Sequence, residues 1–227
     1  MEIHAPHHPI QSWRDIVLHL AIVTVGILIA LGLEQTVEWY HHRQLAAEAR
    51  ETILNEIRSN KIDLDSQIAR LAKHRSNAIE VYDFISDMLD HGKSDHHSLH
   101  LTMSQARLRN TSWTTAQTVG ALAFIPYAAV EEYAAVYHRQ DDYLVAQSRA
   151  EDVGVGAYSV FAVRNKFEKL SHPQLETERE RLMNLISAVT VEIQMADGLT
   201  KSYNGLLSGK TDATQSASQA PALRVGC

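Results

Sequence analysis

The chain has 227 residues, a formal net charge of −6 and a single cysteine, Cys227. This length supports one or two domains with a sizeable core, and 45% hydrophobic with 21% charged residues is typical of a folded protein rather than a disordered one. The negative charge argues against a nucleic-acid partner, and one cysteine excludes an intrachain disulfide and a cysteine metal site. Only ten glycines and five prolines occur, which favours helices.

The first predicted element is a membrane-spanning helix over residues 16–33, IVLHLAIVTVGILIALGL, which follows a short N-terminal tail, residues 1–15. Its only polar residues are His19 and Thr24. A helix of this length covers about 27 Å, roughly the hydrocarbon thickness of a bilayer. Aromatic residues typical of membrane interfaces flank it on both sides: Trp13 before it, and Trp39 and Tyr40 after it.

Two other interpretations of this stretch are a cleaved signal peptide and a buried helix. Ala30 and Gly32 are spaced like a cleavage site, but the apolar run is long for a signal peptide and no helix breaker follows before Gly92. A core helix of a soluble protein would show a polar stripe. We therefore expect an uncleaved anchor.

The anchor suggests a location and a means of self-association. Because a short tail easily stays in the cytoplasm, we expect a single-pass protein of the bacterial inner membrane with the bulk of the chain periplasmic, although the Lys/Arg balance barely discriminates. Gly26 and Ala30 form a small-xxx-small pair that would let two helices approach closely. His19 is either a proton-linked site or a neutral imidazole near the interface.

A helical bundle is predicted over residues 34–207, beginning with one long amphipathic helix that continues the anchor to about Asp90. Apolar residues recur there every seven positions: Ile57, Leu64, Leu71, Ala78 and Ile85. The companion positions hold Ile68, Tyr82 and Leu89.

Shorter elements follow a break at HGKSDHHS, residues 91–98. We expect a short helix over 98–109, a second break at NTSWTT with Thr114 and Gln117 as a capping box, and a short helix ending near Phe124. Pro126 is suited to the first turn of a new helix, which would run to about Leu170. Its inward residues would be Val130, Tyr133, Tyr137 and Leu144.

The last predicted helix follows Pro173 and has a seam with alternating steps of four and three residues. The seam consists of Leu182, Ile186, Val189, Ile193, Ala196, Thr200, Tyr203 and Leu207. Residues 208–227 are small and polar, and we expect them to be a disordered tail.

Residues that could carry chemistry are few. His91, His96, His97 and His100 form the densest histidine group, and His96 and His100 would share a helix face at a spacing usable by zinc or nickel. A metal site, a pH sensor and a solvated connector are all compatible with this group.

Three other stretches resemble functional motifs or sites. GLLSGKT, residues 205–211, is one residue short of a phosphate loop and lacks the strand before it, and Gly154 and Gly156 lack the third glycine of a dinucleotide fingerprint. The aromatic stretch from Trp113 to Tyr137 is either a binding groove between helices or a packed helix corner. The sequence therefore indicates no catalytic, cofactor-binding or metal-binding residue, and no cofactor.

Two stretches together resemble a bacterial family of uncharacterised, membrane-anchored helical proteins, a domain-of-unknown-function group. They are VTVGILIALGLEQTVEW, residues 23–39, and SWTTAQTVGALAFIPYAAVEEYAAVY, residues 112–137. The resemblance implies an inner-membrane protein of Gram-negative type with one N-terminal helix and a helical domain. It brings no activity and no functional residues.

The expected fold is all-α, with one transmembrane helix continuing into a long amphipathic helix and further antiparallel helices forming a bundle. We expect a non-enzymatic interaction or scaffold protein whose partner is a second copy or another membrane protein. The alternatives are a sensor-like ligand-binding bundle and a metal- or pH-responsive protein that uses the group from His91 to His100.

Overall fold

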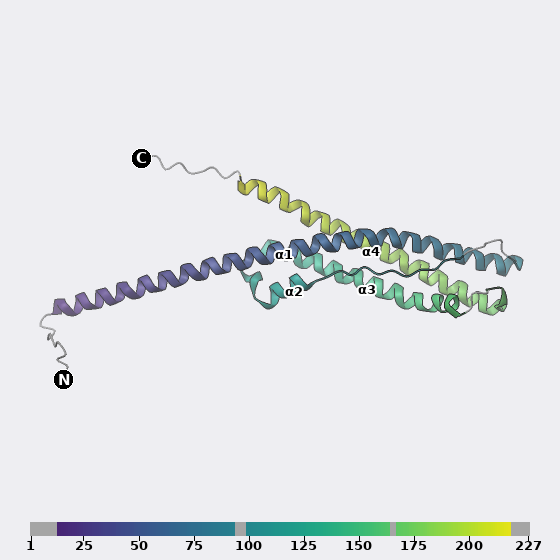
Figure 1. The fold of residues 1–227 in the computed structure, drawn as a ribbon, viewed down its shortest axis with the longest axis horizontal. Helices are drawn as coiled ribbons and strands as arrows, with labels where there is room; N and C mark the ends of the chain where they lie inside the picture. Colours follow the sequence, from purple (N-terminus) through teal and green to yellow (C-terminus); the bar gives the residue numbers. More distant parts are fainter. Residues whose placement is uncertain (1–12, 94–98, 164–166, 219–227) are drawn as a thin grey trace, which may run out of the picture. The chain divides into compact units, whose positions relative to one another are not determined.

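The computed structural model describes residues 13–93, 99–163 and 167–218, and within these ranges every regular element is a helix. The predicted all-helical class is therefore confirmed. The chain divides into two compact units, residues 1–48 and 49–227. The elements, labelled in Figure 1, are α1 (Trp13–His91), α2 (Thr111–Thr118), η1 (Ala121–Phe124), α3 (Tyr127–Val163), η2 (Phe167–Lys169) and α4 (His172–Ser218).

The first unit contains the one helix in the described residues that is long and apolar enough to cross a membrane. Its most apolar window of 18 residues has a mean hydropathy of 2.7, and 0% of that window is buried. The two polar side chains of this stretch bond to their own helix. The Thr24 hydroxyl donates to the Leu20 carbonyl at 2.7 Å, and His19 Nδ1 donates to the Asp15 carbonyl at 2.9 Å. Such internal bonds suit a helix that has no water beside it.

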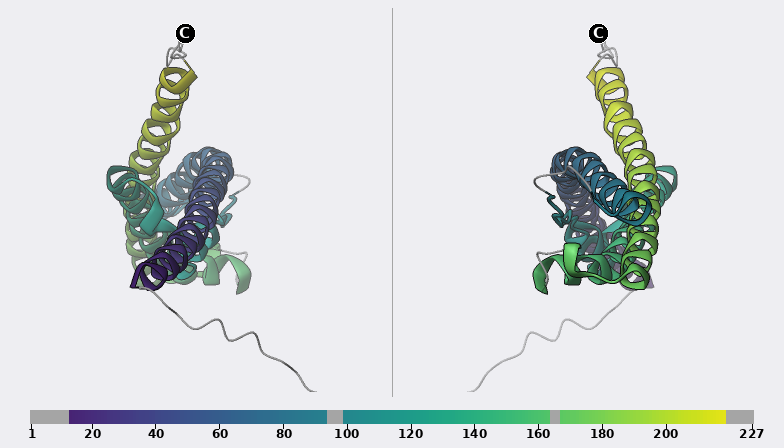
Figure 2. Two further views of the ribbon diagram at one scale, coloured as in Figure 1. Left: turned by 90° about the vertical axis from the view of Figure 1, so that its left-hand side faces the viewer. Right: turned by 90° about the vertical axis from the view of Figure 1, so that its right-hand side faces the viewer.

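α1 continues without a break into the second unit, as its sequence predicts. All five residues of the seven-residue repeat are buried there, with exposed fractions of 0 or 1%: Ile57, Leu64, Leu71, Ala78 and Ile85. This half of α1 packs with α3 and α4, and Figures 1 and 2 show the three helices running along one another. The core between them is joined by Phe84 from α1 and Phe167 from η2, whose rings meet edge to face at 5.7 Å.

Residues 99–110, which we call the return segment, contain no helix, so the prediction of a short helix over 98–109 is wrong for the part that the structure describes. The segment lies along α1 and is held by side chains rather than by a strand. Asn60 of α1 forms hydrogen bonds with both backbone groups of Arg109. Its Nδ2 donates to the carbonyl at 2.6 Å, and its Oδ1 accepts from the N–H at 2.9 Å.

Gln147 of α3 holds Ala106 in the same two-sided way. Its Oε1 accepts from the Ala106 N–H at 2.8 Å and its Nε2 donates to the Ala106 carbonyl at 3.3 Å. Gln67 Nε2 donates to the Ser104 carbonyl at 2.7 Å, and the Tyr158 hydroxyl donates to the Thr102 carbonyl. The buried backbone of the segment therefore finds partners without a neighbouring strand.

The length of α1 explains why this segment is extended. α1 rises about 50 Å between Glu56 and His91, at 1.5 Å per residue. The chain has to cover that distance again, because the Ser112 N–H donates to Glu56 Oε2 at 2.9 Å. A helix over 98–109 would advance only about 18 Å, so almost all of the remaining residues of the connection would have to be fully extended.

The corner before α3 also departs from the prediction. NTSWTT is not a break, since α2 begins at Thr111, and Asn110 at its N-cap makes no side-chain cap bond. Gly120, with a φ of 72°, provides the left-handed residue that ends this turn of chain, and α3 begins after Pro126 as expected. In α3, Tyr133 and Tyr137 are buried, while Val130 and Leu144 are half-buried.

The inward face of α4 is rotated slightly from the predicted seam. Leu182, Val189, Ala196 and Tyr203 are buried as expected, but the companion line consists of Leu185, Glu192 and Leu199 instead of Ile186, Ile193 and Thr200. α4 also extends to Ser218, beyond the point where a disordered tail, residues 208–227, was expected. No proline follows Gly209 before Pro221, so the chain carries no helix breaker there.

Candidate functional site

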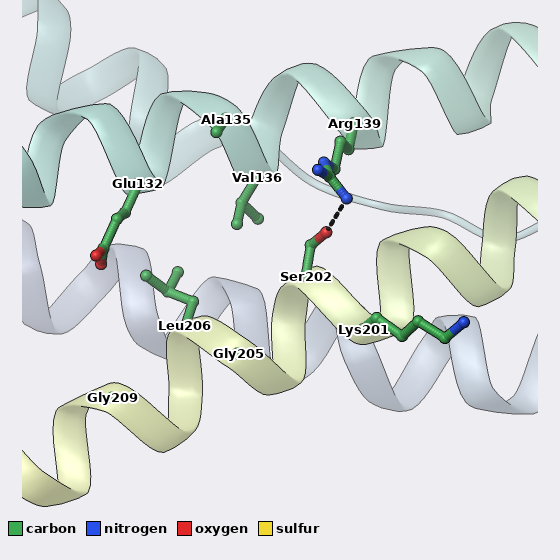
Figure 3. Close-up of a pocket in the computed structure, with 9 residues that line it drawn as sticks. All are labelled: Glu132, Ala135, Val136, Arg139, Lys201, Ser202, Gly205, Leu206 and Gly209. Carbon is green, nitrogen blue, oxygen red and sulfur yellow. Dashed lines mark hydrogen bonds between the residues drawn. The ribbon is translucent and has the colours of Figure 1, made fainter.

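A groove of about 410 Å³ lies between α3 and α4 (Figure 3). Figures 1 and 2 show the C-terminal part of α4 diverging from α3, and the groove lies on that part of the helix. Val136 and Leu206 supply apolar walls, while Gly205 and Gly209 form one side without any side chain. A Cβ added at either glycine would meet nothing within 4 Å. The two glycines therefore leave this side of the groove open, with space that a larger side chain could occupy.

The charges of the groove are distributed along its length. Figure 3 shows Arg139 reaching from α3 toward Ser202 of α4, and its Nη1 donates to the Ser202 hydroxyl at 3.0 Å. Lys201 points along α4 beside it, whereas Glu132 lies at the other end. An elongated apolar group with an anionic end near Arg139 matches this arrangement.

The aromatic stretch from Trp113 to Tyr137 forms a packed corner in the structure. Trp113 is stacked on Tyr137 with ring centroids 5.4 Å apart, and the Tyr137 hydroxyl donates to Glu56 Oε1 of α1 at 2.7 Å. Burial raises the pKa of Tyr137, and its bond to Glu56 raises it further, so the phenol keeps its proton. Tyr127 is exposed and takes no part in this stack. The groove of Figure 3 lies elsewhere, between α3 and α4.

The histidine group can be placed only in part. His96 and His97 lie outside the described residues, while His91 ends α1 and His100 is exposed in the return segment. Among the residues that the structure describes, no three His, Cys, Asp or Glu side chains gather in a way that could hold a metal ion. The stretches that resemble nucleotide-binding loops, residues 205–211 and 154–156, both lie within helices, α4 and α3.

A second group of polar residues, absent from the predicted sites, lies at buried positions of the seam. Asn60 and Gln67 of α1 are seven residues apart and 0% exposed, and Gln140 and Gln147 of α3 repeat that spacing. Glu192 of α4 is 3% exposed. Because polar residues at these places interrupt the apolar pattern, hydrophobic periodicity alone does not mark them as inward positions. Their regular spacing of seven residues is the feature that would have identified them.

A comparison of the chain with protein-family models, with curated proteins and with solved structures finds no match in any of the three. The resemblance of residues 23–39 and 112–137 to a family of membrane-anchored helical proteins therefore stays a prediction.

Proposed function

We propose that this chain is a single-pass membrane protein whose helical unit, from Ala49 onward, serves as a non-enzymatic interaction or scaffold module. The observation that carries the proposal is the apolar window of α1, of which 0% is buried. An uncovered stretch of that length is far more apolar than a water-facing helix, and a bilayer would cover it. The bacterial inner membrane with the bulk of the chain periplasmic is the location we propose.

The internal contacts of the second unit support an antiparallel bundle. Residues early in α3 bond to residues late in α4, since Arg139 bonds to Ser202 and the Tyr203 hydroxyl donates to Gln140 Oε1 at 2.6 Å. Between α1 and α3 the order is the same in both helices, with Glu56 bonded to Tyr137 and Asn60 to Gln140. We infer that α3 runs in the direction of α1 and that α4 runs against both.

The use of polar groups in this unit also supports a scaffold role. Asn60, Gln67 and Gln147 bond to the backbone of the return segment, and the hydroxyls of Tyr137, Tyr143 and Tyr203 bond to buried side chains. These groups are engaged in fixing the shape of the unit. Crosslinking in cells followed by mass spectrometry tests the proposal. Recovery of a reproducible partner supports it, and recovery of the chain alone, uncrosslinked even to itself, contradicts it.

A second copy is the partner we propose for the anchor. Gly26 and Ala30 leave the helix surface flat, and a Cβ at Gly26 would meet nothing within 4 Å. Replacing both residues by Leu should abolish a dimer in detergent, as measured by light scattering. Gly32→Leu is the matched control, because that glycine is equally open but lies on another face of the helix. A monodisperse monomer of the unaltered chain, or equal loss in the control, would remove the dimer.

A second candidate function is binding of a small amphiphilic anion in the groove between α3 and α4. Its support is the glycine-lined hollow with Arg139 at one end. Octanoate titrated into the protein should shift the amide NMR signals of Gly205 and Gly209. Gly205→Leu should abolish the shifts because its side chain fills the hollow, whereas Gly198→Leu, at an open glycine of α4 outside the groove, should keep them. Unchanged signals in the unaltered chain would rule out this ligand class.

A further inference from the structure

A small void, partly open and lined by both polar and apolar residues, lies in the second unit at a point where its three long helices and the return segment meet. Its wall includes His74 from α1, Ser104 from the return segment, Glu151 from α3 and Glu192 from α4. The void measures about 20 Å³. That is room for a single water molecule, provided that polar partners surround it.

The wall supplies such partners. His74 Nε2, Ser104 Oγ and Glu151 Oε1 are each buried without a hydrogen-bond partner among the described residues. An unsatisfied buried polar atom is expensive, at about 1–3 kcal/mol, and native structures hold few of them. Three around one void are the arrangement that a bound water completes: a hydroxyl and an imidazole nitrogen that can donate or accept, and a carboxylate oxygen that accepts.

Tyr143 and Gln67 can both donate to Glu192, and the geometry also accommodates a proton on its own carboxyl group. The Tyr143 hydroxyl lies 3.0 Å from Gln147 Oε1 and 3.2 Å from Glu192 Oε1. The two-sided bond of Gln147 to Ala106 fixes which end of the amide is the oxygen. One phenol proton bonds to one of the two acceptors. A neutral Glu192 completes the set, because its own proton bonds to the Tyr143 oxygen while Tyr143 donates to Gln147.

We propose that this void is a binding site for one water molecule and one proton, which together join His74, Ser104, Glu151 and Glu192 and fasten the return segment to the three long helices. The proton lies on Glu192. From there the bonds run through Tyr143 and Gln147 to the backbone of Ala106. Loss of the proton leaves a carboxylate beside Glu151 and weakens this connection.

The surrounding groups agree with a neutral Glu192. Burial raises the pKa of Glu192 to about 7, Glu151 adds to the rise, and hydrogen bonds from Tyr143 and Gln67 oppose it. Burial lowers the pKa of His74, which favours the neutral imidazole. The titratable and charged groups that face the void or Tyr143 from each element are Arg70 and His74 of α1, Tyr143, Glu151 and Tyr158 of α3, and Glu192 of α4. The return segment contributes the uncharged Ser104.

The direction of the pH effect follows from the raised pKa. A carboxyl group that holds its proton more tightly in the folded than in the unfolded chain stabilises the fold fully below its ordinary pKa of 4.5. That contribution is lost as the pH rises from there through about 7. His74 acts in the opposite sense below its ordinary pKa of 6.5, where the unfolded chain takes up the proton more readily.

The test compares the unaltered full-length chain with Glu192→Gln, in detergent, by chemical unfolding at pH 5 and pH 8. The Gln variant is neutral at every pH. Its unfolding equilibrium constant, divided by that of the unaltered chain, should therefore fall by about a hundredfold from pH 5 to pH 8. Glu180→Gln is the matched control on the exposed face of α4 and should show no such change. An equal effect of Glu192→Gln at both pH values would overturn the proton site.

Two measurements on the unaltered chain do not depend on a variant that folds. The carboxyl carbon signal of Glu192 should titrate with a midpoint near 7, and a midpoint near the ordinary 4.5 would refute the proton. At pH 5, a slowly exchanging water should give nuclear Overhauser effects to Leu71 and Ala150, whose side chains also line the void. A dry void in that spectrum would refute the water.

Discussion

Buried amide side chains in this protein make the backbone hydrogen bonds that a neighbouring strand would otherwise make. Asn60 and Gln147 each bond to both the N–H and the carbonyl of one residue in the return segment, as the opposite residue of a β-ladder would. Each of these backbone groups would cost about 1–3 kcal/mol if it were buried unpaired. The amides therefore contribute more to the free energy of unfolding than apolar residues of the same volume would at these positions.

Two glycines of α3, two residues apart, provide a residue-scale test of packing around the return segment. A Cβ at Gly154 would lie 3.0 Å from Tyr158 Cε2, whereas one at Gly156 would come no closer than 3.7 Å to Arg181. Gly156→Ala should stabilise the unit by about 0.5–1 kcal/mol through helix propensity. Gly154→Ala should lose that gain, because the Tyr158 ring has to move and its hydroxyl bonds to the Thr102 carbonyl.

Urea unfolding of the two variants beside the unaltered chain measures this difference. An equal gain in both would show that the position of the Tyr158 ring does not matter for stability.

At the scale of elements, the return segment should be protected from hydrogen exchange at particular residues even though it has no regular structure. The amides of Ala106 and Arg109 donate to buried side chains and should exchange slowly. Gln147→Leu should speed exchange at Ala106 strongly and at Arg109 much less, since Arg109 depends on Asn60. NMR-detected exchange gives the rates residue by residue. Fast exchange at both amides in the unaltered chain would mean that the segment is not held as described.

How far the elements could be predicted from the sequence depended on whether the deciding forces were local. The repeat from Ile57 to Ile85 marked α1, and Pro126 marked the start of α3, because apolar spacing and a missing N–H act within one turn. A short helix was predicted over residues 98–109, where the sequence contains no glycine or proline. The extended form of residues 99–110 is imposed by the length of α1 and by amides far away in the sequence, which no local pattern contains.

The candidate sites were harder to predict for the same reason. In the sequence, Gly205 and Gly209 stand out only as part of an incomplete phosphate loop, and no motif contains His74 or Glu192. These residues become a groove and a void only when helices distant in the sequence are brought together. A polar residue at a buried position of a repeat was the one signal available, and it was weak for Glu192 because the predicted seam was rotated away from it.

At the scale of the whole molecule, the division into two units predicts that the second folds without the first. A chain beginning at His41 keeps about two turns of helix before Ala49 and lacks the apolar window. It should stay in solution without detergent and unfold within a few degrees of the full chain, as followed by circular dichroism. The full chain should remain with the membrane after alkaline extraction. Loss of helix in the shortened chain would show that the anchor is needed for folding.

The manner in which the return segment is held has a consequence for how the sequence can diverge. Because the amide bonds reach its backbone, the number of residues in the segment is fixed by the spacing of the amides that hold it. Side chains are constrained at fewer positions, among them the buried Ala106 and Ser104 at the void. A distant relative would keep two amide pairs, at positions 60 and 67 of one helix and 140 and 147 of another. The connection between them would keep its length. Insertions and deletions there should be rarer than substitutions, the reverse of what is usual for an irregular connection.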